Sequence, residues 1–421
     1  MNPGMQGWLQ EYLEFRKGSL KAYQTDKKKT VHPEQALYRI IQPTGLMYGH
    51  SAAALDHPDS SKWTEPERLK ILLAESLIGS SILFYEKPLS TEQELSAIVQ
   101  RTIESITNFY NHVFPELATS SKSWFGKKKT TMELAEQILE KRVGRSSSQA
   151  NNFWVNFFHN SLLFLDIYIF GEWIHTKGDQ IVSDFFKYQR EELRFSVVKI
   201  IASSAHANHI IEFEERKLFE FFLESAHLST EKKKEARAIL DQGLEIEGIE
   251  LPTNNSWILR KYFLEMAILT IWADKKVGDE ELVFLKRLTK HLNFTDDEME
   301  SSMIAIEGFL LQNWDQLEHL QNKTAFEQVS EQFIKRIAKV TELHKGRLIK
   351  EVKGNEEMVK LLRQSQSDEL DTEDKLRMRE MIIAILKTIP NFSLVSLPQN
   401  FLTLPILLKV LPKDFFIEAL N

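Results

Sequence analysis

The stretch FEQVSEQFIKRIAKVTELH, residues 326–344, indicates the fold class because its apolar residues recur at spacings of three and four. An α-helix turns once every 3.6 residues, so this spacing places them on one face with charged residues between. That face is made of Phe326, Val329, Phe333, Ile337, Val340 and His344. The same spacing runs through most of the chain, in which glycine and proline number only 16 and 12. The sequence therefore predicts an all-α fold, a multi-helix array without strands.

The length, net charge and cysteine content of the chain limit its possible functions. A chain of 421 residues can bury more than one core. Polar, turn-rich stretches divide it into an N-terminal helical region (1–185), a middle helical domain (186–320) and a C-terminal helical region (321–421). The absence of cysteine excludes disulfides, thiolate metal ligands and cysteine nucleophiles. Because the formal net charge is -7, we expect no nucleic-acid partner.

The N-terminus and the pattern of reactive side chains predict a cytoplasmic protein that is not an enzyme. The start, MNPGMQGWLQEYLEFRKG, lacks the uninterrupted apolar core of a secretory signal because Gln10, Glu11 and Glu14 interrupt it. No nucleophile, base and orienting acid stand at a recognisable spacing, so we predict neither catalytic residues nor a cofactor site. Two placements stay open: free in the cytoplasm, or held peripherally or partly inserted at the inner membrane.

The middle domain contains an internal repeat of 66 residues (280 minus 214). Shifting the chain by this length aligns residues 205–233 with residues 271–299 without a gap. The aligned pairs include Ala207 with Ala273, Asn208 with Asp274, Ile211 with Val277, and Leu228 with Phe294. Such a repeat predicts that each copy is a helix, a tight turn and a helix, with the aliphatic residue buried at the corner.

The corner of the second copy carries a group of acids, for which two interpretations stay open. In the first, Asp279 caps the second helix, and Glu280 and Glu281 favour the positive end of its dipole. In the second, the four carboxylates bind a divalent cation weakly. A complete calcium-binding EF-hand loop is excluded because Lys275 stands where the loop needs glycine. The candidate metal ligands are Asp274, Asp279, Glu280 and Glu281.

Both copies resemble the tellurite-resistance B-like (TerB-like) helical domain. The resemblance rests on an apolar helix, the Ala273-Asp274 pair, the aliphatic Val277, the Glu280-Glu281 pair and a second apolar helix. It covers about 100 of the 421 residues. It implies two helix-turn-helix repeats and a metal-responsive binding module at the acidic corner.

The C-terminal segment, residues 385–420, is apolar and broken by four prolines at intervals of 8, 7 and 7. Helical pieces of about two turns therefore alternate with breaks. Between Phe392 and Leu411 the only charged residue is Lys409. Either lipid or other helices of the protein must cover so apolar a segment, and the prolines favour shallow or protein-covered insertion over a clean span. The predicted membrane or partner contacts are Pro390, Phe392, Pro398, Phe401, Pro405, Leu408 and Pro412.

This tail resembles the membrane-proximal signature of the leucine-zipper/EF-hand transmembrane (LETM) family. The matching residues are Pro390, Phe392, Pro398, Leu404, Pro405, Leu408, Lys409 and Pro412. The resemblance implies a membrane-associated protein of ion homeostasis, similar to bacterial LETM-related proteins described as biofilm-associated. Because the chain stops at Asn421, before the family's ribosome-binding domain, we expect no ribosome docking. The expected partner is a membrane surface or a helical protein, and the alternative function is a soluble helical adaptor.

The run FWVNFFHNSLLFLDIYIFGEWI, residues 153–174, is the most apolar stretch before the tail. It could form a helix buried in the protein core with Asp166 hydrogen-bonded, or a membrane helix carrying an intramembrane acid. An aspartate near the centre of a bilayer costs about 3 kcal/mol, which favours the buried helix.

Overall fold

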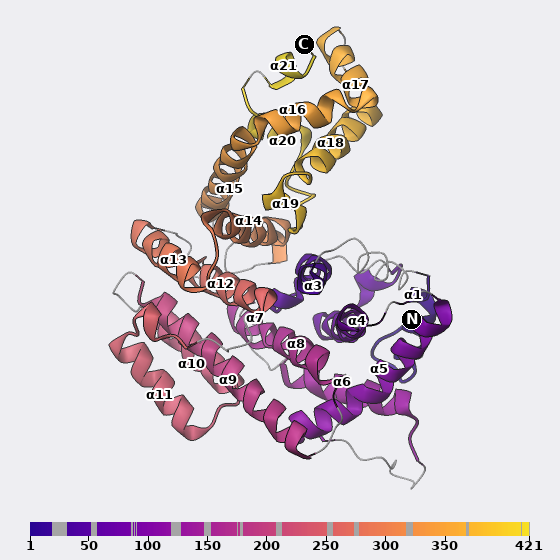
Figure 1. Ribbon diagram of the computed structural model, residues 1–421, viewed down its shortest axis with the longest axis vertical. Coiled ribbons are helices and arrows are strands. Elements are labelled where there is room, and N and C mark those ends of the chain that lie inside the picture. Colours follow the sequence, from indigo (N-terminus) through magenta and orange to yellow (C-terminus); the bar gives the residue numbers. More distant parts are fainter. Residues whose placement is uncertain are drawn as a thin grey trace. The chain divides into compact units, whose positions relative to one another are not determined.

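The computed structural model describes residues 1–18, 32–51, 57–85, 87, 89, 91–118, 128–146, 153–174, 176, 180–207, 213–250, 256–272, 278–316, 323–367, 370–413 and 415–420. These residues form helices and no β-strand, which confirms the predicted all-α fold (Figure 1). Their contacts divide the chain into two compact units, unit 1 (Met1–Arg287) and unit 2 (Leu288–Asn421). The division into three regions at 185 and 320 stays a prediction.

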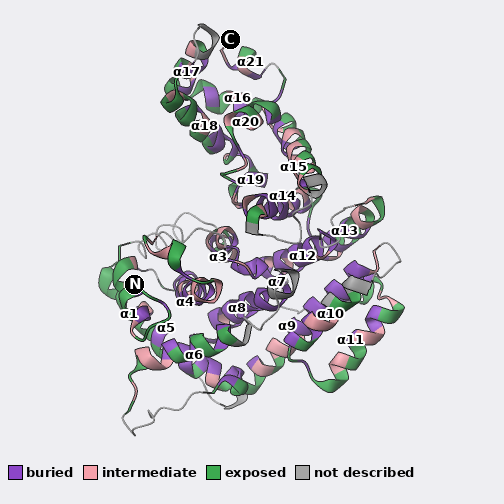
Figure 2. Cartoon of the chain, turned by 180° about the vertical axis from the view of Figure 1, so that it is seen from behind, coloured by how far each residue is buried: buried purple, intermediate pink, exposed green. Residues whose placement is uncertain are grey.

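Unit 1 is a helical array built around two apolar helices. Its helices are α1 (Trp8–Arg16), α3 (Pro33–Ile41), α4 (Glu65–Phe84), α5 (Glu92–Val113), α6 (Thr131–Ser146), α7 (Phe153–Ser161), α8 (Leu163–Trp173), α9 (Gln180–Ala205), α10 (Phe213–Ser225), α11 (Thr230–Gln242), α12 (Trp257–Trp272) and α13 (Asp279–His291), which ends beyond the boundary. Nearly every residue of α8 and α12 is buried (Figure 2). Helix α4 packs against α8, and α9 packs against both α8 and α12.

Capping boxes set where several helices begin. At the start of α5, the Glu94 backbone N–H donates to Thr91 Oγ1 at 3.2 Å, and the Thr91 N–H donates to Glu94 Oε2 at 3.0 Å. The same exchange between Thr295 and Glu298 begins α14 (Asp296–Gln312). Each pair satisfies two N–H groups that an isolated helix end leaves without partners, and losing such a cap costs about 1 kcal/mol.

The apolar run 153–174 forms two helices, α7 and α8, which meet at Leu162. Asp166 lies in α8 with no exposed surface and accepts a hydrogen bond from Tyr110 Oη at 3.1 Å. The interpretation as a buried helix with a hydrogen-bonded acid is therefore confirmed. Within the part of the chain that is described, no helix has both the length and the hydropathy needed to cross a membrane.

The 66-residue repeat is visible in the backbone. Helices α10 and α13 have the same length and start 66 residues apart (279 minus 213). Helices α11 and α14 differ in length but also start 66 residues apart (296 minus 230). The two non-glycine residues with positive φ, His227 at 51° and Asn293 at 54°, are also 66 apart (293 minus 227). Each copy therefore extends to a third helix beyond the predicted pair. The predicted corner residues Asn208, Ile211, Asp274 and Val277 lie outside the described residues.

Unit 2 is a second helical array. It contains α14, α15 (Lys323–Leu343), α16 (Lys345–Lys353), α17 (Glu356–Ser367), α18 (Thr372–Leu386), α19 (Pro390–Ser393), α20 (Leu404–Val410) and α21 (Phe415–Leu420). Helix α15 has the stripe expected from its sequence: Val329, Phe333, Ile337 and Val340 are buried. His344, the last member of that stripe, lies just after the helix ends.

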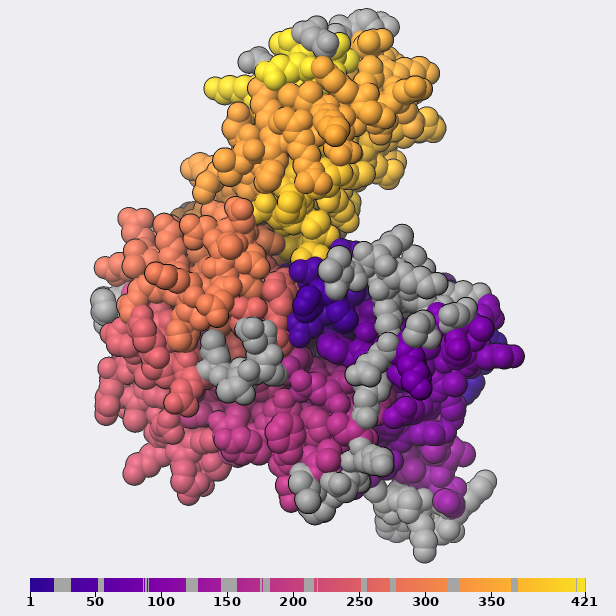
Figure 3. All heavy atoms as spheres, viewed as in Figure 1, coloured from indigo at the N-terminus to yellow at the C-terminus, as the bar shows by residue number. Residues whose placement is uncertain are grey.

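The proline-rich tail is part of the core of unit 2. Helix α19 packs on α14, α20 packs on α15 and α18, and α21 packs on α16 and α17 (Figure 1). In Figure 3 the yellow atoms of the tail lie against the orange atoms of the same unit. Pro390 and Pro405 each stand in the first turn of a short helix, where a missing N–H costs nothing. The tail also has polar anchors: Arg379 Nε donates to the Leu402 carbonyl at 2.8 Å, and Ser301 Oγ donates to the Asn391 carbonyl at 3.1 Å.

The residues predicted to contact a membrane or partner fall into two groups. Phe392, Pro398 and Pro412 are buried, and Phe401 is half-buried with its ring 5.7 Å from that of Phe333. Helices of the same unit thus cover the larger apolar side chains of the tail. The exposed residues are Pro390, Pro405 and Leu408.

Replacing Phe392 by alanine should lower the free energy of unfolding by about 3–5 kcal/mol, because it leaves a cavity in a packed core. Leu408→Ala, in the same tail but 41% exposed, serves as the control and should change it by less than about 0.5 kcal/mol. Urea unfolding of the full chain, followed by far-ultraviolet circular dichroism, measures both. Equal effects of the two substitutions would contradict the packing of the tail in the core.

Candidate functional site

A groove of about 520 Å³ lies in unit 1 beside the acidic corner. Three segments far apart in sequence line it: the end of α9 with residues 203–207, the loop after α11 with residues 242–246, and the first part of α13. The volume is within the range of pockets that hold a small ligand or a few side chains of a partner.

The groove carries more negative than positive charge. Its described lining includes the carboxylates of Glu245, Asp279 and Glu280, and the guanidinium of Arg287. Arg287 Nη2 lies 2.9 Å from Glu245 Oε2 and 3.0 Å from Glu247 Oε2, and these bonds raise the pKa of Arg287. The positive charge of Arg287 is therefore compensated within the protein, while Asp279 and Glu280 are exposed.

An apolar side chain lies on the groove next to these acids. Val283 is 59% exposed, and the neighbouring Phe284 is almost buried. Residues three and four apart share one face of a helix, so α13 presents Asp279, Glu280, Val283 and Arg287 along the groove. The groove can therefore contact a partner that combines positive charge with an apolar side chain.

The start of α13 differs from the predicted cap. Helix α13 begins at Asp279, so Gly278 takes the N-cap position that the sequence had given to Asp279. The Gly278 backbone N–H donates to Glu281 Oε2 at 3.0 Å, the bond that the third helical residue makes in a capping box. Assigning the cap to Asp279 was therefore wrong, because glycine is also accepted at an N-cap and Glu281, three residues further on, accepts from its backbone N–H.

The residues predicted as metal ligands have different roles in the structure. Asp279 and Glu280 line the groove, Glu281 accepts from Gly278, and Asp274 lies outside the described residues. Among the residues that are described, no group of three or more histidine, aspartate or glutamate side chains could hold a metal ion. The four-residue cation site stays a prediction.

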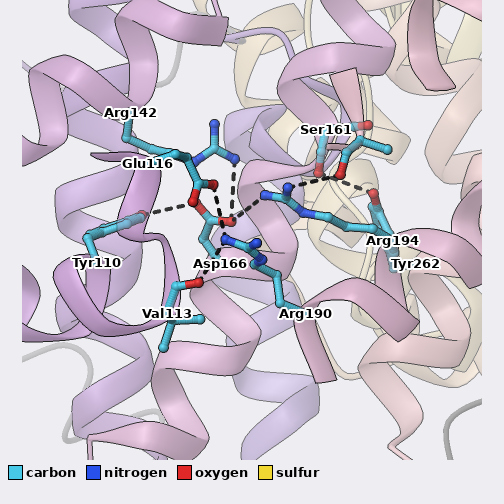
Figure 4. Close-up of polar contacts among 10 residues, drawn as sticks. Tyr110, Val113, Glu116, Arg142, Ser161, Asp166, Arg190, Arg194 and Tyr262 are labelled. Carbon is cyan, nitrogen blue, oxygen red and sulfur yellow. Dashed lines mark hydrogen bonds and ion pairs between the residues drawn. The ribbon is translucent and has the colours of Figure 1, made fainter. Parts of the chain in front are cut away.

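A buried charge centre ties together four helices of unit 1 (Figure 4). Arg142 of α6 donates through Nε to Asp166 Oδ2 at 2.5 Å, and Tyr110 of α5 donates to the same oxygen. Arg194 of α9 places Nη2 3.8 Å from Asp166 Oδ1. Burial, and then the negative charge of Asp166, raise the pKa of Tyr110 well above its ordinary value.

A second ion pair borders this centre. Arg190 Nη1 donates to the Val113 carbonyl at 2.7 Å and to Glu116 Oε1 at 3.0 Å. Burial, the largest single effect, raises the pKa of Glu116, but the charges of Arg190 and Arg194 and the hydrogen bonds of the carboxylate together outweigh it, and the pKa is lowered. The Phe114 ring lies 4.6 Å from the guanidinium carbon of Arg190 and 5.3 Å from that of Arg194. The aromatic face therefore takes part in holding the arginines together.

Other buried carboxylates have protein partners of their own. In unit 1, Glu265 accepts from Tyr38 Oη at 2.6 Å and from Tyr48 Oη at 2.8 Å, which links α12 to α3 and to the turn after it. In unit 2, Arg336 binds Glu307 through Nε and Nη2, at 3.1 Å each. Burial raises the pKa of Glu307 to about 7, against the opposing effect of Arg336.

Sequence reasoning found some of these residues and missed others. It identified Asp166 as a buried acid with a partner, but not Tyr110, Arg142 or Arg194, which lie on other helices. It identified Asp279 and Glu280 as an acidic corner, but not the groove beside them. The sequence signal available for such partners is only a charged residue within an apolar helical stripe, and this does not say which residues pair.

No family model matches the chain, and neither a curated protein nor a solved structure is significantly similar to it. The TerB-like and LETM-like resemblances rest on their motifs alone.

Proposed function

We propose that the protein is a non-enzymatic helical adaptor whose groove at α13 binds a short basic and apolar segment of a partner protein. The observation that carries the proposal is the exposure of Asp279, Glu280 and Val283 side by side along a groove of about 520 Å³. A lysine or arginine of the partner would lie against the two carboxylates, and an apolar side chain would cover Val283.

The charges of the groove favour this partner over an acidic one. Since Glu245 and Glu247 compensate Arg287, an acidic segment would meet the exposed carboxylates of Asp279 and Glu280. Like charges at a contact cost free energy, whereas opposite charges speed association and select the partner. Binding through exposed charges should also weaken as salt is added.

The packing of the tail also supports an adaptor. Phe392, Pro398 and Pro412 lie in the core of unit 2, so an adaptor can bind its partner in unit 1 without releasing the tail. An adaptor function is therefore compatible with an apolar tail that belongs to the folded core.

The test is the affinity of the full chain for a fluorescent peptide of alternating lysine and leucine, with a glutamate and leucine peptide as the opposite-charge probe. Asp279→Lys with Glu280→Lys should weaken binding of the basic peptide at least tenfold. The matched control, Asp296→Lys with Asp297→Lys, makes the same charge change in the first turn of α14 and should leave the affinity within twofold. Equal loss in both double variants, or equal binding of the two peptides, would contradict the groove as the binding site.

A second candidate is the peripheral membrane association implied by the LETM-like resemblance, with a role in ion homeostasis. It is favoured by exposed residues of the tail: Pro405, Leu408 and Lys409 of α20, and Ile417 of α21, which is 58% exposed. A short helix with exposed apolar and basic residues can lie at the surface of an anionic membrane.

Co-sedimentation with vesicles tests this candidate. At low salt the full chain should sediment with phosphatidylglycerol vesicles and less with phosphatidylcholine vesicles, and Leu408→Asp with Ile417→Asp should lower the bound fraction several-fold. Protein that stays in the supernatant with the anionic vesicles would rule out the association.

A further inference from the structure

A small cavity, which shares no lining residue with the groove, borders the Asp166 centre. It is independent of the proposed adaptor function. It measures about 10 Å³, about the size at which a buried site holds one water molecule or a monatomic ion. Its polar lining residues are Glu116, Arg142, His159, Arg194, Ser225 and His227. His227 is exposed, so a small occupant has a route to solvent.

Arg194 lines this cavity, and the hydrogen bonds of its guanidinium are incomplete. Its side chain is 3% exposed. Nη1 donates to the Ala226 carbonyl at 3.1 Å, and Nη2 lies beyond hydrogen-bond distance from Asp166. Nε is buried and has no hydrogen-bond partner among the described residues. A buried donor of a charged group left without an acceptor costs more free energy than a neutral donor in the same position.

The charges around the cavity do not balance. Three arginines, Arg142, Arg190 and Arg194, meet two carboxylates, Asp166 and Glu116. Asp166 is held by Arg142 at hydrogen-bond distance, and Glu116 is held in the same way by Arg190. The excess positive charge among the described groups is therefore on Arg194, which has no carboxylate at hydrogen-bond distance among them.

We propose that the cavity binds a chloride ion, which accepts a hydrogen bond from Arg194 Nε and balances the third arginine. A water molecule would fit the same volume and accept the same bond, but it would leave the buried charge uncompensated. A polyatomic anion such as sulfate needs more room than a site for one water-sized particle gives. A chloride ion satisfies both the open donor and the excess charge.

The pKa values of the lining agree with a site that lacks an anion. Burial and the neighbouring Arg190 lower the pKa of Arg194 to about 9. Burial, followed by the charges of Arg194 and Arg142, lowers the pKa of His227 to about 4. Burial is the larger cause of both pKa shifts, and the neighbouring positive charges add to them; a bound anion would reduce this second contribution.

The experiment compares the full chain in sodium chloride, sodium bromide and sodium gluconate at equal ionic strength. Chloride and bromide should raise the melting temperature above that in gluconate, in a way that follows the binding isotherm of one site. In crystals soaked in bromide, an anomalous peak should lie in the cavity within contact distance of Arg194 Nε.

Substitutions separate this site from a general salt effect. Arg194→Gln removes both the charge and the Nε donor and should abolish the difference between halide and gluconate. Arg336→Gln, which alters a buried arginine of unit 2 that has carboxylate partners, should retain it. If Arg194→Gln fails to fold, the bromide soak of the unaltered protein decides. Equal melting temperatures in chloride and gluconate, or a cavity that holds only water at saturating bromide, would overturn the proposal.

Discussion

The ion pair between Arg142 and Asp166 is made where water does not reach, and that constraint organises unit 1. Asp166 has no exposed surface and lies on α8, one of the most apolar helices. An ionised carboxylate there needs partners from every side, and α5, α6 and α9 supply them through Tyr110, Arg142 and Arg194. A pair of this kind contributes little net stability when complete, but breaking it costs about 3–5 kcal/mol. It therefore selects one arrangement of four helices over alternatives that would leave a charge unpaired.

In unit 2 the corresponding constraint is an apolar tail that must be covered. Two coverings, lipid or the protein's own helices, were compatible with the sequence of residues 385–420. The four prolines divide this segment into pieces too short to be stable helices alone, and each piece packs on a longer helix of the same unit. Phe392 is buried because α19 lies against α14, and the polar anchor from Arg379 satisfies a carbonyl that the helix breaks leave open. The exposed part of the tail is limited to residues such as Leu408 and Ile417.

The features that could be predicted from the sequence are those that depend on neighbours along the chain. Apolar spacing gave the helices, and a shift of 66 residues gave a repeat whose helix starts and positive-φ residues also recur at 66. The cap of α13 was misassigned because Gly278 and Asp279 are both acceptable caps, and only the bond to Glu281 distinguishes them. The groove and the Asp166 centre could not be predicted, because each joins segments tens of residues apart, and charge alone does not pair Asp166 with Arg142 rather than with another arginine.

Asp166 and Arg142 act as one buried pair, and a double-mutant cycle measures their coupling directly. The free energies of unfolding of the unaltered chain, Asp166→Asn, Arg142→Gln and the double variant would be determined by urea unfolding. Each single substitution strands its partner, so the double variant should be more stable than the sum of the single effects predicts, with a coupling of about 2 kcal/mol or more. Effects that add to within about 0.5 kcal/mol would contradict the account, because residues that do not interact behave in that way.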